Sequence, residues 1–160
     1  MGLSKESCRR RFVVPKRSAL VATGVSVVTM AGVAVAADPT VMKGTARVGN
    51  SNRSVVVSST SQTLYALSGE SVGRVTTLKC INQSCFAIWV PLKTTVNERL
   101  TKGPGVNGTL GRLQRVRARF YQVMLNGKPL YRYVGDRNTK GSARGNGIRS
   151  FGGTWSVVNP

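Results

Sequence analysis

The sequence predicts a mainly β fold, a small antiparallel sheet domain built from a tandem repeat with pseudo-twofold character. Short runs of β-branched and aromatic residues are separated by Gly, Asn, Ser and Pro, which is typical of strands and turns. No long amphipathic helical period occurs after residue 37. A segment around Tyr65 recurs 66 residues later around Tyr131, and a Trp follows each Tyr after 24 residues.

The repeat is defined by a few scarce residues. An ungapped overlay of residues 62–92 on 128–158 aligns identical Leu, Tyr, Gly and Trp residues, and it uses both Trp residues of the chain. Glu70 and Asp136 add a like-charged pair. The alternative is a single β-rich domain whose aromatic core residues align by coincidence. These positions are Leu64, Tyr65, Gly69 and Trp89 in the first copy and Leu130, Tyr131, Gly135 and Trp155 in the second. Their Tyr and Trp residues, together with Tyr133, are expected to be core residues rather than a binding platform, because aromatic side chains dominate the energetics of burial.

Each predicted element follows from a local pattern. Residues 38–52 are expected to be a flexible lead-in, and residues 53–160 the β domain. Asn126 and Gly127 predict a two-residue hairpin turn, because both tolerate positive φ. Pro91 is expected to close a strand, since proline cannot donate to a ladder. Residues 94–101 could form one helical turn. Six to eight strands are expected, drawn from residues 53–59, 63–67, 87–92, 109–113, 116–125, 130–134 and 154–158.

The boundaries of the two copies follow from these elements. Repeat 1 spans about residues 53–92, a connector spans residues 93–108, and repeat 2 spans about residues 109–160. The connector is rich in turn signals, with Gly103, Pro104 and Gly105 in succession.

The N-terminus resembles an export signal. Residues 1–17 are basic, residues 18–37 carry no charge, and small residues precede Asp38. This order is typical of a secretory signal peptide cleaved near Ala36 or Ala37. The alternative is a retained membrane anchor, which requires about 20 apolar residues. Residues 9–13 also resemble the twin-arginine motif, although Cys8 and Val14 depart from it, so both export routes remain open.

The chain is strongly basic. It carries 24 Lys and Arg against five Asp and Glu, with no His, for a formal net charge of +19. Residues 1–37 hold six basic residues and one acid, so the rest keeps 18 basic and four acidic residues, a net charge of +14. Such a balance predicts attraction to polyanions. It suits anionic envelope polymers, lipid headgroups and nucleic acid alike.

Two cysteines remain beyond the signal. In an exported protein, the even pair Cys80 and Cys85 predicts a disulfide that closes a short loop. A redox-active pair is the alternative, although four residues separate the two thiols rather than the two of the usual redox motif.

The residues of a catalytic or metal site are missing from the sequence. The lack of His argues against nucleophilic triads and zinc hydrolysis, and two Cys cannot complete a tetrahedral zinc shell. Glu70 and Asp136 could act as an acid/base pair, but turn capping or pairing with a nearby Arg is the simpler interpretation. The sequence therefore predicts no catalytic residue, no cofactor and no small-molecule substrate.

A run of arginines suggests where an anion would bind. On a continuous strand, Arg115, Arg117 and Arg119 would share one face, with Arg132 on an adjacent strand. This face predicts an anion-binding stripe that tracks phosphates, or simply a solvated sheet face.

The second copy of the motif resembles a known family. Residues 131–136 read Tyr-Arg-Tyr-Val-Gly-Asp, and with residues 126–130 and 152–155 they resemble the bacterial secreted repeat of unknown function. Tyr133 supplies the middle aromatic residue of that motif. Residues 60–158 share the pattern, more loosely in the first copy, where Leu67 and Glu70 depart from it. Members of that family are exported and are often lipoproteins. The resemblance implies an exported protein without a settled activity, but not membrane tethering, because no Cys lies at the end of the uncharged segment.

These observations favour an exported, non-enzymatic protein of the bacterial envelope or the extracellular space that binds anionic polymers or surfaces through a basic face. One alternative is a redox or electron-transfer accessory that uses Cys80 and Cys85. Another is an intracellular protein that binds nucleic acid, with the N-terminus acting as a basic arm.

Overall fold

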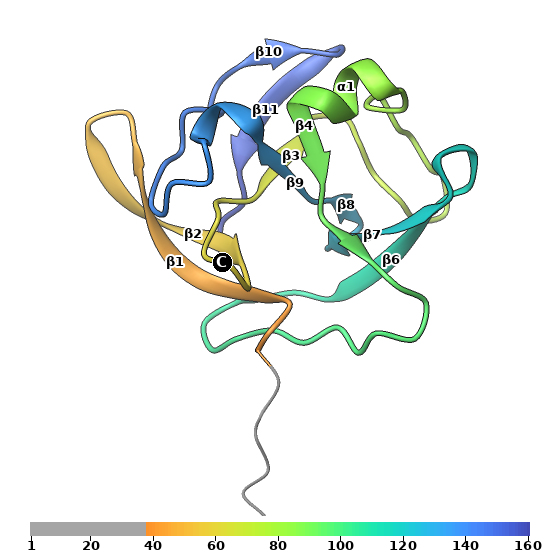
Figure 1. Ribbon diagram of the computed structural model, residues 1–160, viewed down its shortest axis with the longest axis horizontal. Coiled ribbons are helices and arrows are strands. Elements are labelled where there is room, and N and C mark those ends of the chain that lie inside the picture. The colour runs from red at the N-terminus through yellow and green to blue at the C-terminus, as the bar shows by residue number, and fades with distance from the viewer. Residues whose placement is uncertain (1–37) are drawn as a thin grey trace, which may run out of the picture. The chain divides into compact units, whose positions relative to one another are not determined.

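The computed structural model describes residues 38–160, so the predicted export signal lies outside the described residues. This part of the chain is mainly β and its strand pairs are antiparallel, which confirms the expected fold class (Figure 1). It contains eleven strands rather than six to eight, because several pairings are only two or three residues long. The strands are β1 (Val41–Val48), β2 (Ser51–Ser58), β3 (Tyr65–Leu67), β4 (Trp89–Pro91), β5 (Lys93–Thr94), β6 (Leu110–Arg115), β7 (Phe120–Leu125), β8 (Lys128–Pro129), β9 (Tyr131–Tyr133), β10 (Arg149–Ser150) and β11 (Gly153–Val157).

The strands form three sheets. A central five-stranded sheet has the order β10-β11-β3-β9-β4, and the hairpin of β1 and β2 forms a sheet of its own. The third sheet has the order β5-β7-β6, with β8 paired to β7. One α-helix, α1 (Gln83–Ile88), precedes β4, and two short 3-10 helices, η1 (Val116–Ala118) and η2 (Val134–Asp136), follow β6 and β9.

The pairing register of the central sheet relates the two copies of the motif. Tyr65 pairs directly with Tyr131. On one side Leu67 pairs with Trp155, and on the other Tyr133 pairs with Trp89. Shifting either flanking pair by the 66-residue offset yields the other pair. A twofold axis between Tyr65 and Tyr131 would produce this arrangement, which supports the pseudo-twofold prediction without testing a duplication.

The same exchange occurs in the backbone hydrogen bonds at the ends of this sheet. Leu92 N donates to Leu130 O, and Val158 N donates to Leu64 O. Replacing each residue of one bond by its counterpart in the other copy, 66 positions away, gives the other bond. Each copy therefore supplies a backbone acceptor to the other copy at these ends of the sheet.

The core consists of three clusters of buried residues. One is aromatic and sulfur-rich, and its buried members are Tyr65, Leu67, Cys80, Cys85, Trp89, Tyr131 and Trp155. A second, aliphatic cluster centres on Leu64 and Leu130. The third lies under the β1–β2 hairpin. The expectation that the repeated Tyr and Trp residues are core residues is thus confirmed.

Several local predictions were wrong. Residues 41–48 of the expected flexible lead-in form β1, which pairs along its whole length with β2. Ala87 and Ile88, predicted as strand, end helix α1, because Asn82 caps that helix by accepting from Cys85 N. Residues 94–101 contain no helical turn. The expected strand 116–125 is broken by η1 and by Arg119 at φ 55°.

The turn predictions were more accurate. Asn126 at φ 52° and Gly127 at φ 71° join β7 to β8, as expected for a two-residue hairpin. Pro91 ends β4, which is an edge strand of the central sheet. An edge strand tolerates proline because its outer backbone groups have no ladder partner.

Candidate anion-binding surface

The aromatic core cluster contains a stack of the two tryptophans. The rings of Trp89 and Trp155 lie 3.8 Å apart at an interplanar angle of 6°. Tyr65 meets Trp89 edge-on, and Tyr131 meets Trp155 edge-on. This buried arrangement offers no open aromatic face, so the repeated aromatic residues stabilise the fold and do not form a binding platform.

Each tyrosine donates to the carboxylate of the other copy. Tyr65 Oη donates to Asp136 Oδ2 at 2.6 Å, and Tyr131 Oη donates to Glu70 Oε2 at 2.9 Å. Both carboxylates are buried, with 3% of Glu70 and 6% of Asp136 exposed. The repeat in the sequence predicted related positions for these two acids. It did not predict that each acid would accept from the tyrosine of the other copy.

The remaining oxygens of these carboxylates hold loops. Glu70 Oε1 accepts from Lys79 N and Cys80 N, both at 2.8 Å. Asp136 Oδ1 accepts from Ser142 Oγ at 2.8 Å and from Arg144 N at 2.9 Å. Both acids therefore act as anchors for loop backbone, and their environment favours this structural role over acid/base chemistry.

These contacts predict a loss of stability at alkaline pH. Burial, followed by the hydrogen bond to Asp136, raises the pKa of Tyr65 well above its ordinary value of 10.0. Burial and the charge of Glu70 likewise raise the pKa of Tyr131. Above pH ~10 the unfolded chain loses both phenolic protons while the folded chain keeps them. The free energy of unfolding should therefore fall with rising pH by about 1.4 kcal/mol per pH unit for each Tyr, until the folded-state pKa is reached.

Urea unfolding between pH 9 and 11.5 measures this effect. The Tyr65→Phe variant should show a shallower decline than the parent protein, because it has lost one of the two linked protons. Equal slopes in the two proteins would show that the buried phenol does not keep its proton in the folded state.

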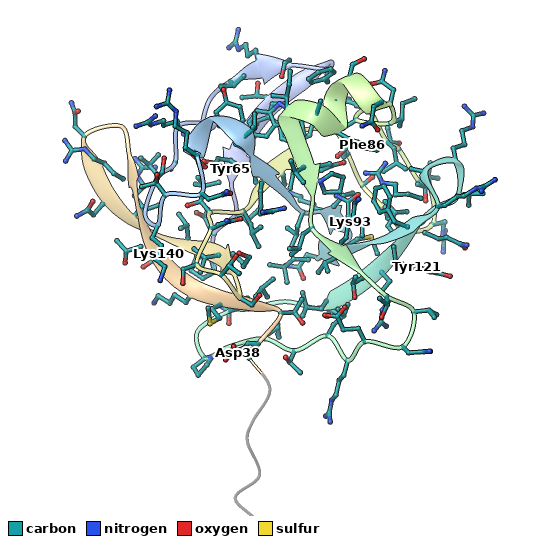
Figure 2. All side chains as sticks on the ribbon, in the orientation of Figure 1. Asp38, Tyr65, Phe86, Lys93, Tyr121 and Lys140 are labelled. Atoms are coloured by element: carbon teal, nitrogen blue, oxygen red, sulfur yellow. A yellow bond between two sulfur atoms is a disulfide. The ribbon has the colours of Figure 1, made fainter. Side chains whose placement is uncertain are left out.

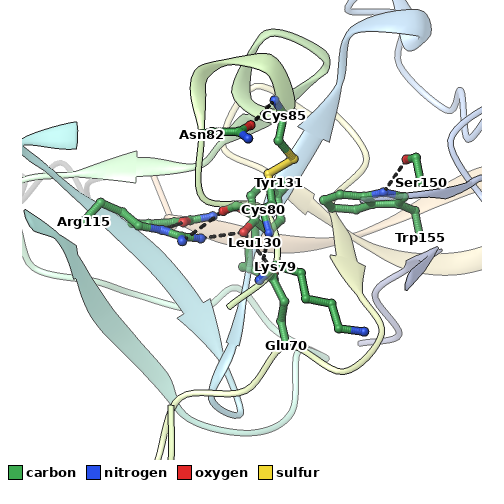
Figure 3. Close-up of a disulfide and its surroundings, with 11 residues drawn as sticks. Glu70, Lys79, Cys80, Asn82, Cys85, Arg115, Leu130, Tyr131, Ser150 and Trp155 are labelled. Carbon is green, nitrogen blue, oxygen red and sulfur yellow. Dashed lines mark hydrogen bonds between the residues drawn. A yellow bond between two sulfur atoms is a disulfide. The ribbon is translucent and has the colours of Figure 1, made fainter. Parts of the chain in front are cut away.

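The predicted arginine stripe does not exist as one face. Arg115 is buried, donating to Gln122 Oε1 at 2.7 Å, Cys80 O at 3.1 Å and Tyr131 Oη at 2.5 Å (Figure 3). Arg117 lies in η1, and Arg119 adopts the left-handed conformation that reverses the chain into β7. Arg132 is in a different sheet and donates to Gln62 Oε1. The strand break at residues 116–119 separates these side chains, so this set is not an anion-binding stripe.

The predicted disulfide is confirmed. Cys80 and Cys85 are bonded, with their Cα atoms 5.5 Å apart, and both are fully buried beside Tyr131 and Trp155 (Figure 3). Cys80 also lies between two anchors, since its N–H donates to Glu70 and its carbonyl accepts from Arg115. This environment favours a structural role for the bond over redox exchange, which needs an accessible sulfur.

Replacing both cysteines with Ser should therefore lower stability and leave ligand binding intact. A disulfide that closes so short a loop contributes somewhat less than ~3 kcal/mol in the chain-entropy model, so we expect a loss of about 2 kcal/mol in the free energy of unfolding. Urea unfolding with and without reductant measures this loss. Unchanged stability combined with a lost activity would instead support the redox alternative.

The surface is more basic than the sequence indicates. The sequence from residue 38 has four carboxylates, but Glu70 and Asp136 are buried, which leaves only Asp38 and Glu98 exposed. Of the 18 Lys and Arg residues only Arg115 is buried. Nitrogen-tipped side chains accordingly project from strands and loops on several sides (Figure 2). Burial of the two acids concentrates positive charge at the surface.

Two grooves on this surface are lined by basic side chains. The first, of about 510 Å³, is lined by Arg47, Lys140 and Arg144 among others. The second, of about 380 Å³, includes Lys93 and Arg132 beside the hydroxyl residues Ser58, Ser59 and Thr60. The first groove could not be predicted, because Arg47 comes from the expected lead-in and its partners from a loop about 90 residues later. Arg132, part of the predicted set, does line the second.

Other kinds of site find less support in the described part of the chain. No three His, Cys, Asp or Glu side chains come together there as metal ligands would. Among residues 38–160, no helix has the length and hydropathy needed to cross a membrane.

Comparison with known proteins bears on the second copy of the motif. A family model described as a secreted repeat of unknown function matches residues 121–159. Curated proteins and solved structures gave no match. The matched range begins in β7 and ends just after β11, and it contains Tyr131, Asp136 and Trp155. The expected resemblance is therefore confirmed for residues 121–159, which are similar to the secreted repeat of unknown function, while the first copy lies outside the matched range.

Proposed function

We propose that this protein is exported and acts without catalysis, binding anionic polymers or lipid headgroups of the cell envelope or its surroundings through its basic surface. The observation that carries the proposal is the distribution of charge. Seventeen Lys and Arg residues are at least partly exposed, against two exposed carboxylates, because the fold buries Glu70 and Asp136 and only one Arg.

Export is supported by three independent features. The N-terminal sequence has the layout of a signal peptide. The family model that matches residues 121–159 describes a secreted repeat. The buried Cys80–Cys85 bond is the kind of disulfide that persists in an oxidising compartment.

The physical basis of binding is long-range electrostatic attraction. A surface on which one sign of charge predominates raises the local concentration of polyanions and speeds their association. Added salt screens such attraction, since the Debye length falls from about 10 Å at 0.1 M to about 3 Å at 1 M ionic strength. Binding should therefore weaken steeply and continuously with salt.

A titration of the purified protein with long-chain polyphosphate tests the proposal. We expect binding at 50 mM NaCl that weakens linearly on a plot of log affinity against log salt concentration, as counterion release requires. Neutral dextran is the control and should not bind. Failure to bind polyphosphate, polyglutamate and vesicles with anionic headgroups, or affinity that salt leaves unchanged, would contradict the proposal.

A further inference from the structure

The groove lined by Arg47, Lys140 and Arg144 has the features of a specific site within the basic surface. It lies between the turn of the β1–β2 hairpin and the loop of residues 139–146, which run side by side (Figure 1). Its volume is about 510 Å³, and no carboxylate is among its lining residues. Thr139, Ser142 and Asn146 add polar side chains to the lining. Three cationic side chains and three uncharged polar side chains thus line one groove.

The loop that carries two of these groups is fixed from several directions. Arg47 N donates to Gly141 O at 2.9 Å, which joins the loop to β1. Thr63 Oγ1 donates to Ser142 O at 2.6 Å. From beneath, Asp136 accepts from Ser142 Oγ and Arg144 N. A loop held in this way is already ordered before a ligand arrives, which lowers the entropic cost of binding.

The charge of Asp136 opposes an anion in the groove only partly. Its side chain is buried beneath the loop, and three donors already share its two oxygens. The side chains of Arg47, Lys140 and Arg144 are all exposed. The groove therefore presents three positive groups to solvent and keeps its one nearby negative group covered.

The corresponding loop of the first copy is arranged differently. There Glu70 takes the place of Asp136 and accepts from Lys79 N and Cys80 N. The ammonium group of Lys79 is directed back to the protein, donating to Ser68 O at 3.0 Å and to Gly152 O at 2.6 Å. Its charge therefore stabilises the fold, whereas Lys140 and Arg144 remain exposed around the groove.

We propose that this groove binds a phosphate group, an inference that rests on the proposed function and assigns it a site. Arginine presents a planar fork of donors that matches phosphate oxygens in pairs, and lysine adds a point charge. A terminal phosphate or a phosphate monoester offers more acceptor oxygens and more charge than a carboxylate. Such a phosphate can therefore accept from the three cationic side chains and a hydroxyl more completely than a carboxylate can. The phosphate can belong to a polymer or to a lipid headgroup.

The matched pair of variants separates a local site from total charge. The groove variant R47Q/K140Q/R144Q and the control variant R74Q/R99Q/R117Q each remove three exposed positive charges. For long-chain polyphosphate at 50 mM NaCl, we expect the groove variant to lose about tenfold or more in affinity, as for charge-assisted hydrogen bonds. The control variant should lose no more than about threefold, as for exposed charges. Vesicles with phosphatidic acid, whose headgroup is a phosphate monoester, are tested in parallel and show whether lipid phosphate uses the same groove.

A second measurement uses the unmodified protein and so does not depend on the folding of a variant. Inorganic pyrophosphate titrated into the ¹⁵N-labelled protein should shift the amide resonances of Arg47 and residues 139–146 more than those of other segments. Equal losses in the two triple variants, or shifts spread evenly over the surface, would overturn the phosphate site and leave the proposed function standing. If the unmodified protein binds none of the polyanions, both the function and the site are wrong.

Discussion

Replacement of Glu70 by Ala is expected to lower the free energy of unfolding by about 3–5 kcal/mol, the range for removing one partner of a buried charged network. The substitution leaves Lys79 N, Cys80 N and Tyr131 Oη without their acceptor. It also removes the negative charge at the end of a hydrogen-bond chain in which buried Arg115 donates to Tyr131 Oη and Tyr131 Oη donates to Glu70. The three donors that lose their acceptor are unsatisfied unless water enters, and burial makes that costly.

Urea unfolding followed by circular dichroism measures the loss. Glu98 provides the control, because it is an exposed carboxylate that accepts only from Thr94 Oγ1 and Thr95 N among the described residues. Glu98→Ala should cost less than about 1 kcal/mol. A loss of less than 1 kcal/mol for Glu70→Ala as well would show that the buried network does not anchor the loop of residues 71–80.

Truncation of Trp155 to Ala should be similarly damaging, with an expected loss of about 3–5 kcal/mol. The substitution removes the ring that stacks on Trp89 and meets Tyr131, and leaves a cavity in the aromatic core cluster. Because the ring lies where the two copies meet, its loss should lower the stability of the whole unit in a single transition. Two separate transitions would contradict the shared core.

The two tryptophans differ in a way that offers a finer comparison. Trp155 Nε1 donates to Ser150 Oγ at 3.0 Å, whereas Trp89 Nε1 is buried with no acceptor among the described residues. Trp155→Phe loses a hydrogen bond, while Trp89→Phe removes an unsatisfied donor. We therefore expect Trp155→Phe to be less stable than Trp89→Phe by about 1 kcal/mol.

The sequence predicted the centre of this fold better than its periphery. Tyr65, Tyr131, Trp89 and Trp155 were expected in the core, because scarce aromatic residues at a fixed offset mark positions that bury the most surface. The turn at Asn126 followed from backbone preference alone. Both signals are local or repeated, and both can be read without knowledge of the tertiary pairing.

The predictions that were wrong concern features that depend on contacts between distant segments of the chain. Residues 41–48 lack a clean strand pattern and are ordered by pairing with β2, so they were wrongly assigned to a lead-in. The sequence pattern around Arg115 fits an exposed, alternating strand equally well. Its burial becomes evident only when Gln122, Cys80 O and Tyr131 Oη are placed around it.

The charge of the surface could also be predicted only in part from the sequence. The composition provides the net charge, but it does not show that two of the four acids are buried as loop anchors. Asp136 connects the core to the groove, since it accepts from Tyr65 in the core and from the loop that carries Lys140 and Arg144. The fold itself therefore shapes the basic groove, which no pattern in the sequence indicates.

The most direct test of an exported, polyanion-binding protein is the intact mass of the protein recovered from a salt wash of whole expressing cells. We predict that it is retained at the cell surface at low ionic strength and released by about 0.5 M NaCl, where charge screening is strong. Its mass should correspond to a chain beginning at Ala37 or Asp38, with Cys80 and Cys85 blocked to alkylation until reduction. Full-length protein found only inside the cell with free thiols would contradict export, and surface retention that salt leaves unchanged would contradict electrostatic binding.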